Sequence, residues 1–448
     1  MNKTQFIIAA PSSNGGKTTF TLGILRALQK RGISTQPFKA GPDYIDPKFH
    51  ELACGKTGIN LDIFMMGEEH IRETYAHYIQ KSQVACVEGV MGLFDGAIKA
   101  QGSTAQLAKL LKLPVILVVD AKATAYSVAP LLYGFKNFDP TIDIAGVIFN
   151  RVNTSSHYQF LVDACQDVGV TPLGHLPFLE NCTIPSRHLG LSLAEIDKYQ
   201  ATIDNLAIAL EKYVDIDKLL EVCQRPTKPV NDYSVTEASD ANFTTAVAKD
   251  EAFNFCYPQN IRALKRKGKV VFFSPLRDSK IPEANLIYLP GGYPEYYLEA
   301  LSKNVSMQKS IYEYANSSGK IIAECGGLMY LGQAIIDKEG KTHPMTHVFD
   351  FKTSMEQMKL HLGYRHIQVQ ELELKGHEFH YSNMIESKNT PTIGTITNAR
   401  NQAVKTFMYQ YKSVLASYVH LYFGTDQLLE IVLNLRKQSS LNQISNSQ

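Results

Sequence analysis

The stretch Pro11-Ser12-Ser13-Asn14-Gly15-Gly16-Lys17-Thr18-Thr19 decides how the first part of this sequence folds. It follows an apolar run, 6–10, that is typical of a buried strand, and it leads into 19–31, where apolar residues recur at helical spacing. A strand, a glycine-rich turn and a Lys-Thr pair that opens a helix form the local pattern of a phosphate-binding loop. In such a loop, backbone N–H groups at the helix N-terminus converge on phosphate oxygens. The pattern therefore predicts nucleotide binding.

The residues of this loop receive individual roles. Those expected to bind ATP are Asn14, Gly15, Gly16, Lys17, Thr18 and Thr19. Lys17 is expected to reach the outer phosphates, and the Thr18 hydroxyl is expected to hold a Mg²⁺. Pro11 stands where the usual pattern has its first glycine. That departure argues against a GTPase-like loop, and the stretch resembles the variant loop of dethiobiotin synthetase and the partition ATPases.

Length and composition limit the classes of protein to which the sequence can belong. A chain of 448 residues is long enough for two or three domains, and 44% hydrophobic with 20% charged residues is typical of globular proteins. Because 45 basic residues nearly balance 43 acidic ones, we expect neither a nucleic-acid partner nor binding to an acidic membrane. Seven cysteines without a CxxC motif, no apolar run of membrane-spanning length and no leader-like N-terminus predict a cytoplasmic protein.

Strand-like apolar runs alternate with helical patterns through the first half of the chain. Strands are expected at 33–38, 84–89, 113–120 and 144–150, and this alternation predicts a parallel sheet with right-handed crossovers. In such a sheet, functional groups collect at the carboxyl ends of the strands. The polar side chains expected at that edge are Asp46, Glu88, Asp120 and Asn150.

Oxygen-bearing side chains near this edge are the candidate metal ligands. Because Mg²⁺ prefers hydroxyl and carboxylate oxygens, we expect Thr18, Glu88 and Asp46 to hold it. Asp43 is equally well placed to be the third ligand. Alternatively, Asp43 and Asp95 orient a reacting carboxylate of the substrate, or cap helices and turns.

The composition also divides the chain into domains. A helix expected at 199–223 closes a first domain, 1–224, and the polar stretch 225–250 is expected to be a linker. A second domain is expected at 251–437, followed by a polar tail, 438–448. The predicted fold class is α/β, with an N-terminal P-loop parallel-sheet domain and a C-terminal α/β domain.

The second domain carries a candidate nucleophile. Ala323-Glu324-Cys325-Gly326-Gly327 reads as a strand, a sharp turn and a helix with Cys325 at its apex, which is a nucleophile-elbow pattern. The helix N-terminus is expected to lower the thiol pKa, and the Gly326 N–H to serve as an oxyanion donor. A second donor is expected from Gly291 or Gly292. His420, at the end of a strand expected at 413–419, is the candidate base.

Several motifs together resemble a known family. AECGGLMYL, YLPGGYPE, LGYR, GHEFHYS and ASYVHLYF resemble the class I glutamine amidotransferase domain of the cobyrinic-acid branch. PFKAGPDYIDPKFH, VEGVMGLFDG and IPSRHLGL resemble the dethiobiotin-synthetase-like ligase domain that accompanies it. Outside the expected linker and tail, the whole chain is similar to the a,c-diamide synthases of corrinoid biosynthesis.

The resemblance implies a ligase with two sites, whose partners are cobyrinic acid, L-glutamine and ATP with Mg²⁺. Cys325 would attack the glutamine side-chain amide, form a thioester and release ammonia, while His420 moves the proton. At the other site, the a and c acetate carboxylates would each attack the γ-phosphate of ATP, and ammonia would convert the acyl phosphate to an amide. Many glutamine amidotransferases have a Glu two positions after this His. Tyr422 stands there, and because the cobyrinic branch is similar in lacking that Glu, the expectation is a Cys–His dyad.

Other polar residues receive alternative roles. Arg187 and His188 are expected to grip the acidic corrin periphery or to form structural salt bridges. Lys39 is expected to meet a phosphate or a substrate carboxylate, or to be a solvated loop charge. His377 and His380 have no Cys or further His nearby in sequence, so they are not interpreted as a zinc site and their role is unassigned.

Other functions stay open at this point. The same motifs would serve hydrogenobyrinic acid or nickel sirohydrochlorin as the substrate, or a ligase that uses free ammonia beside an inactive glutamine site. Cobyric acid synthase is another relative, but the PFKAGPDYID and IPSRHLGL stretches argue against it. A partition-type ATPase switch with a partner-binding C-terminal domain would not need the Cys325 elbow. The oligomeric state also stays open, with a homodimer among the alternatives.

Overall fold

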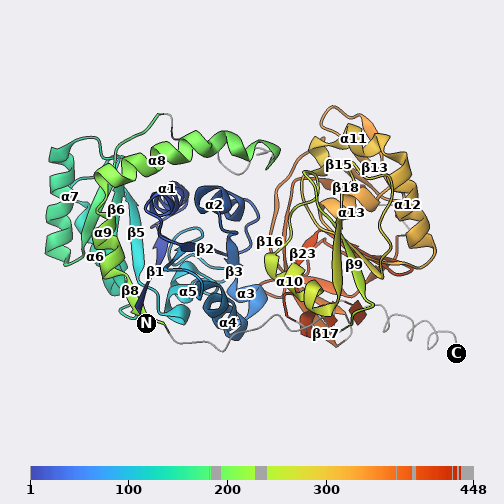
Figure 1. Ribbon diagram of the computed structural model, residues 1–448, viewed down its shortest axis with the longest axis horizontal. Helices are drawn as coiled ribbons and strands as arrows, with labels where there is room; N and C mark the ends of the chain where they lie inside the picture. The colour runs from blue at the N-terminus through green and yellow to red at the C-terminus, as the bar shows by residue number, and fades with distance from the viewer. Residues whose placement is uncertain are drawn as a thin grey trace. The chain divides into compact units, whose positions relative to one another are not determined.

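The computed structural model describes residues 2–180, 182, 193–227, 240–369, 371–385, 390–425, 427–430 and 433–434. The chain divides into two compact units, Met1–Tyr233 and Ser234–Gln448 (Figure 1). Arg187, His188 and the expected tail 438–448 lie outside the described residues. Each unit combines a mainly parallel sheet with helices, so the predicted α/β class is confirmed.

The first unit is built on one sheet with the strand order β3-β2-β4-β1-β5-β6-β7. These strands are all parallel, as the alternation of strand and helix predicts, and β8 adds antiparallel to β1. The strands are β1 (Asn2–Ala9), β2 (Thr35–Ala40), β3 (Ile59–Leu61), β4 (Val84–Glu88), β5 (Val115–Asp120), β6 (Ile144–Asn150), β7 (Pro172–Leu176) and β8 (Gln224–Pro226). The helices are α1 (Lys17–Lys30), α2 (Asp46–Cys54), α3 (Ile63–Met66), α4 (Glu68–Ile79), α5 (Thr104–Leu111), α6 (Val128–Phe138), α7 (Ser155–Val168), η1 (Leu193–Tyr199), α8 (Gln200–Tyr213) and α9 (Ile216–Val222).

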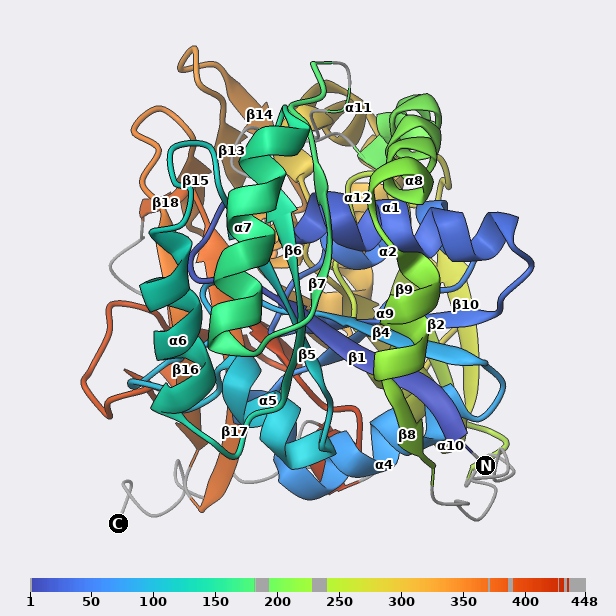
Figure 2. The same cartoon turned by 90° about the vertical axis from the view of Figure 1, so that its left-hand side faces the viewer.

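Helices cover both faces of this sheet, and their apolar sides close its core. Figures 1 and 2 show α1, α2 and α8 on one side of the strands and α4 and α5 on the other. Gly23 lies where α1 meets α8, because a Cβ there would stand 2.3 Å from Cδ1 of Leu210. The helix expected at 199–223 is divided into α8 and α9, since Val214 between them forms a bridge with Gly174 of β7.

The stretch expected to be a linker, 225–250, carries sheet residues at both ends. Its first residues belong to β8 of the first unit, and Thr244–Ala248 forms β9, which lies between β10 and β11 in the second unit. The sequence of this strand, TTAVA, consists mainly of polar and small residues, so it lacks the apolar pattern that predicts a buried strand. Pairing on both sides, together with burial of Ala246 and Val247, supplies the stabilisation that the local sequence lacks.

The second unit has a seven-stranded sheet in the order β10-β9-β11-β12-β22-β21-β19 and two four-stranded sheets. The strands of the large sheet are β9 (Thr244–Ala248), β10 (Lys269–Phe273), β11 (Leu286–Leu289), β12 (Lys320–Glu324), β19 (Thr392–Ile393), β21 (Met408–Tyr411) and β22 (Val414–Ser417). The smaller sheets contain β13 (Ala334–Ile336), β14 (Thr342–Pro344), β15 (Lys352–Ser354) and β18 (Asn383–Ile385), and β16 (His361–Val369), β17 (Leu372–His380), β20 (Thr395–Asn398) and β23 (Val419–Leu421). The helices are α10 (Pro258–Lys267), η2 (Pro294–Tyr296), α11 (Leu298–Lys303), α12 (Val305–Asn316) and α13 (Gly326–Leu331).

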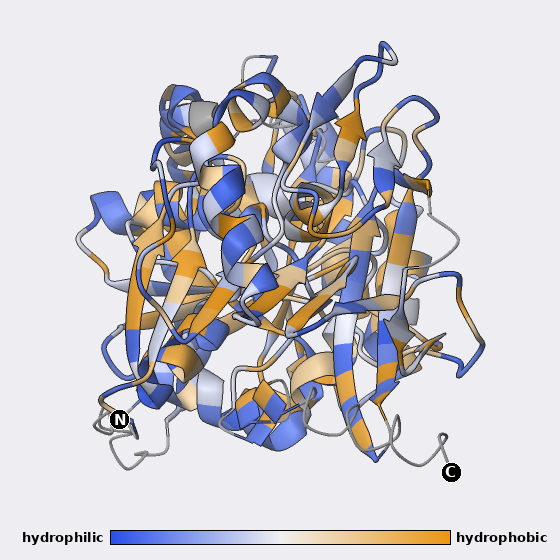
Figure 3. Ribbon diagram, turned by 90° about the vertical axis from the view of Figure 1, so that its right-hand side faces the viewer, coloured by the Kyte–Doolittle hydropathy of each residue, from blue (hydrophilic) through white to orange (hydrophobic). Residues whose placement is uncertain are grey.

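The core of the second unit lies on the apolar strands of its large sheet. Figure 3 shows these strands as mainly hydrophobic, whereas the helices around them carry hydrophilic outer faces. The strand expected at 413–419 is divided, because β22 stays in the large sheet and β23 pairs with β17 instead. His420 therefore lies opposite His377, in the sheet that contains the β16–β17 hairpin.

Within the described part of the chain, none of the helices combines the length and apolar character that a membrane-spanning segment requires.

Two candidate active sites

The phosphate loop of the first unit connects β1 to α1. Gly16 caps α1 with a φ of 106°, a conformation that favours glycine. A Cβ at Gly16 would stand 2.5 Å from Nδ2 of Asn150, and that Nδ2 donates to the carbonyl of Gly15 at 3.3 Å. Asn150, at the end of β6, thus supports the loop from a neighbouring strand. Lys17 curls back over the loop and donates from Nζ to the carbonyls of Ser12 at 3.1 Å and Met91 at 2.5 Å.

Three predicted metal ligands meet beside this loop, together with a cation. Oγ1 of Thr18 donates to Oε1 of Glu88 at 2.6 Å. Nζ of Lys39 lies 2.9 Å from the same oxygen and 2.6 Å from Oδ2 of Asp46. Lys39 is only 1% exposed, so its interpretation as a solvated loop charge is wrong. Its ammonium group instead lies between two buried carboxylates and offsets part of their charge.

His50 completes this cluster, and the sequence analysis missed it. Its Nε2 lies 2.7 Å from Oε2 of Glu88, and both side chains are fully buried. Asp46 and His50 are four residues apart on α2, so they lie on one face of that helix. That spacing, directly after a candidate ligand, is the signal that could have identified His50.

The remaining predicted acidic residues of this unit have local partners. Oδ1 of Asp43 accepts from the backbone N–H groups of Ile45 at 2.8 Å and Asp46 at 3.0 Å, at the start of α2. Oδ2 of Asp95 accepts from the Gly92 N–H at 2.9 Å. These contacts match the turn-capping alternative for both residues. Asp43 therefore holds the backbone that presents Asp46, while Asp46 itself contributes to the cluster.

In the second unit, Cys325 forms a strained turn between β12 and α13. Its backbone has φ 47° and ψ −104°, in the region of positive φ that residues with a Cβ rarely adopt. The turn requires small neighbours, because a Cβ at Gly327 would stand 2.2 Å from the carbonyl oxygen of Leu289, and one at Gly326 would stand 2.8 Å from Cδ of Pro294. The geometry agrees with the elbow that the sequence predicts.

Glycines of the PGG turn bring the candidate base and nucleophile together. A Cβ at Gly291 would stand 2.3 Å from Cε1 of His420 and 3.3 Å from Cβ of Cys325, so both side chains border the same backbone. The Gly292 backbone N is 3.1 Å from where a Cβ of Gly326 would lie. The three predicted oxyanion glycines therefore lie around Cys325.

The electrostatics of this site differ from the expectation. Burial, followed by the negative charge of Glu295, raises the pKa of the Cys325 thiol well above its ordinary value. The Gly326 N–H at the helix N-terminus lowers this pKa, as predicted, but burial outweighs it, because Cys325 is only 5% exposed. Burial, with the nearby His377 and His380, lowers the pKa of His420 to about 3. At rest, the thiol and the imidazole are both neutral.

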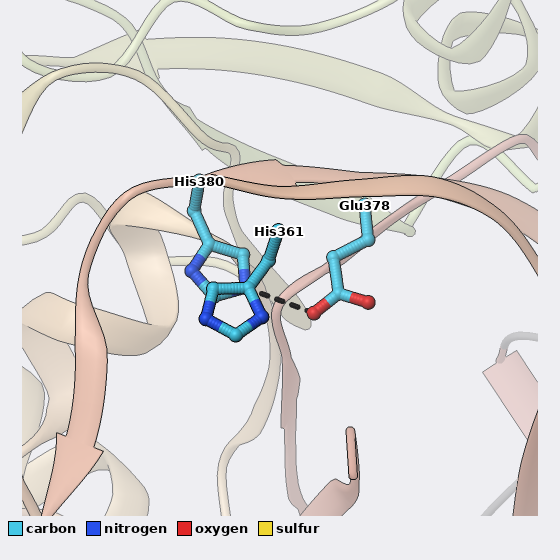
Figure 4. A group of neighbouring side chains, drawn as sticks. All are labelled: His361, Glu378 and His380. Atoms are coloured by element: carbon cyan, nitrogen blue, oxygen red, sulfur yellow. Dashed lines mark hydrogen bonds and ion pairs between the residues drawn. The ribbon is translucent and has the colours of Figure 1, made fainter. Parts of the chain in front are cut away.

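His380 belongs to an ion-pair network beside this site. Its Nε2 lies 2.8 Å from Oε1 of Glu378, while Nε of Arg365 donates to Oε2 of Glu378 at 2.6 Å. The rings of His361 and His380 stack with an angle of 8° between their planes, and Figure 4 shows the two rings overlapping. Parallel rings direct their nitrogen lone pairs side by side, and Arg365 already balances the carboxylate. Although ligand atoms of His361, Glu378 and His380 lie within 4.8 Å of one another, the geometry suits an ion pair better than a metal site.

Comparisons with known proteins match the two parts of the chain to two different domain families. Residues 6–191 match the CobQ/CobB/MinD/ParA nucleotide binding domain, and residues 244–428 match the CobB/CobQ-like glutamine amidotransferase domain. The chain is 40% identical over 437 residues to the cobyrinate a,c-diamide synthase of Salmonella typhimurium, covering 94% of this chain and 95% of the relative. It is 39% identical over 425 residues to the hydrogenobyrinate a,c-diamide synthase of Brucella anthropi, covering 93% and 98%. A cobyrinate a,c-diamide synthase of Saccharolobus solfataricus is 36% identical over 433 residues, with 95% and 99% covered. The chain belongs to the family of cobyrinate and hydrogenobyrinate a,c-diamide synthases.

Proposed function

We propose that this protein is a glutamine- and ATP-dependent ligase that amidates the a and c acetate carboxylates of cobyrinic acid in cobalamin biosynthesis. The observation that carries the proposal is the presence, on one chain similar over 94% of its length to a cobyrinate a,c-diamide synthase, of both a phosphate loop and a Cys–His elbow. ATP would be used in the unit Met1–Tyr233 and glutamine in Ser234–Gln448. The catalytic thiol requires a reducing compartment, which supports a cytoplasmic location.

At the elbow, Sγ of Cys325 attacks the side-chain amide carbon of glutamine while its proton passes to His420. The tetrahedral oxyanion lies toward the N–H groups of Gly326 and of Gly291 or Gly292. When the C–N bond breaks, His420 returns the proton to the leaving nitrogen as ammonia, and a thioester remains. Water then hydrolyses the thioester to glutamate and restores the thiol.

At the phosphate loop, an acetate carboxylate of the substrate attacks the γ-phosphorus of ATP, and ADP leaves. Ammonia then attacks the acyl phosphate, so that an amide forms and phosphate departs. The residues there fit a Mg²⁺, because Thr18, Asp46 and Glu88 offer the oxygen ligands that this ion prefers. Bound there, Mg²⁺ would neutralise phosphate charge. Lys17 supplies positive charge from the loop to the phosphates, whereas Lys39 offsets charge of the carboxylate cluster.

The test is mass spectrometry of the corrinoid after incubation with the protein, ATP, Mg²⁺ and glutamine that is isotopically labelled on its amide nitrogen. Two labelled amides on cobyrinic acid are the expected result. Parallel reactions with hydrogenobyrinic acid and nickel sirohydrochlorin identify the preferred substrate. ATP turnover without amidation of any tetrapyrrole would contradict the proposal and would favour the ATPase switch.

A further inference from the structure

Glu324 is a buried carboxylate that the proposed mechanism does not yet use. It is the last residue of β12, directly before Cys325, and its side chain is fully buried. A carboxylate buried this deeply requires several partners, because desolvation of its charge is otherwise costly. Its partners therefore indicate what keeps it there.

Both oxygens of Glu324 face the strand that carries His420. Oε1 accepts from the backbone N–H of Leu421 at 3.1 Å, and Oε2 accepts from the hydroxyl of Tyr288 at 2.8 Å. Oε2 also lies 4.0 Å from Nδ1 of His420, within ion-pair range but longer than a hydrogen bond. One carboxylate thus contacts the residue after His420 and faces the ring of His420 itself.

A structural role accounts for only part of this arrangement. A neutral amide could also accept from the Leu421 N–H, so holding the strands together does not require a charge. A charge is useful, however, when a buried imidazole beside it must accept a proton. Nucleophile and base pairs in enzymes are commonly completed by a third group that orients the base.

We propose that Glu324 is the positioning residue of His420: it faces Nδ1–H, leaves Nε2 as the basic nitrogen and stabilises the imidazolium that forms when Cys325 loses its proton. This inference rests on the proposed glutaminase function of the second unit. It makes the catalytic group a triad whose carboxylate precedes the nucleophile in the chain.

The electrostatic surroundings give this role a pH dependence. Burial raises the pKa of Glu324 to about 8, although hydrogen bonds from Tyr288 and Leu421 oppose that rise. The other ionisable groups around it are His420, Cys325 and, through Tyr288, Cys256. Because only the ionised carboxylate stabilises the imidazolium, glutaminase activity is expected to rise as the pH increases through about 8.

The experiment compares Glu324→Gln with Tyr288→Phe, which removes a hydrogen bond from the same oxygen but keeps the carboxylate. Both proteins are assayed for glutamate release across pH 6–10, a range bracketing the Glu324 pKa of about 8, and for unfolding by urea, which reports on folding. Glu324→Gln is expected to lower kcat for glutamine on the order of 100-fold with an unchanged KM, and to lose the rise near pH 8. Tyr288→Phe is expected to retain the rise but to move it to higher pH, because the Tyr288 hydroxyl lowers the pKa of Glu324.

Three outcomes separate the possibilities. A Glu324→Gln protein with the wild-type kcat and pH profile would overturn the inference. A wild-type protein that releases no glutamate from glutamine would overturn the proposed function instead. If Glu324→Gln is unfolded in the absence of urea, Glu324→Asp decides, because it keeps a carboxylate: retention of the alkaline rise supports the inference, and its loss contradicts it.

Discussion

The two candidate sites differ in the protonation state of their buried ionisable groups, which are charged at one site and neutral at the other. Beside the phosphate loop, groups of opposite charge form ion pairs, with the Lys39 ammonium between the carboxylates of Asp46 and Glu88. At the elbow, burial raises the pKa of Cys325 and lowers that of His420, so both groups rest in their neutral forms. The difference follows the proposed chemistry, because phosphoryl transfer requires neutralisation of standing charge whereas amide cleavage requires a proton to move.

The largest effect is expected from Cys325→Ala, which separates the two sites. Glutamine-dependent amidation should fall at least about 1,000-fold, because no other group can form the thioester. Amidation with added ammonium should be kept. Cys256→Ser is the matched control, since Cys256 is a partly buried cysteine of the same unit. Equal loss with both nitrogen donors would contradict independent sites.

Lys17→Ala tests the phosphate-loop site of the first unit. Removal of the loop ammonium should reduce ATP-dependent amidation with either nitrogen donor by about 100-fold or more, because charge developing on the phosphates loses a stabilising group. Glutamate release at the elbow, measured without ATP, should persist. Lys30→Ala, at the other end of α1, serves as the control and should leave both activities intact. Normal ATP-dependent amidation by Lys17→Ala would refute the assignment of the loop.

Lys39→Met tests charge balance directly. Without the ammonium, two buried carboxylates repel each other, and the free energy of unfolding should fall by about 3 kcal/mol or more. Mg²⁺ should then restore stability to the variant more than it stabilises the wild type, because the same oxygens are available to it. Urea unfolding with and without Mg²⁺ measures both effects. An unchanged unfolding curve would show that Lys39 does not balance this cluster.

Glu378 is a charged exception beside the neutral elbow, and its contribution should depend on pH. Although burial opposes ionisation, His380 and Arg365 hold its pKa at about 2, below the ordinary 4.5. Ionised Glu378 should therefore stabilise the fold by on the order of 3 kcal/mol above pH 4.5, and this contribution should be lost as the pH falls toward 2. Urea unfolding of wild type and Glu378→Gln measures this difference. A difference that is constant between pH 6 and 2 would contradict it.

The smallest effect is expected away from both sites. Oγ1 of Thr154 accepts from the His157 N–H at 3.2 Å and caps α7. Thr154→Ala should lower the free energy of unfolding by about 1 kcal/mol and leave both activities unchanged. This variant shows what a loss of stability alone does to the assays. If it impaired ligation, the activity losses of the other variants could no longer be assigned to chemistry.

Much of the fold could be predicted because its signals are local. The apolar run before Pro11, the glycines of the loop and the helical spacing after it are adjacent in the chain, as are the residues of the Cys325 elbow. The strand β9 and the division between β22 and β23 could not be predicted, since pairing with distant strands stabilises them rather than their own composition. Local patterns report local structure, whereas strand partners are selected by the assembled core.

The sequence by itself determined which chemical groups the chain carries and the motifs that present Lys17, Thr18 and Cys325. Only the tertiary structure decided which of these groups are charged and which residues contact them. Lys39 and Glu88 are separated by 49 positions, and Leu421 and Glu324 by 97, yet each pair is in contact within the fold. A group's pKa depends on burial and on the charges around it, and neither is encoded in adjacent residues. For that reason the motif predicted a thiol of lowered pKa, while burial in the fold raises that pKa, and we propose His420 as the base.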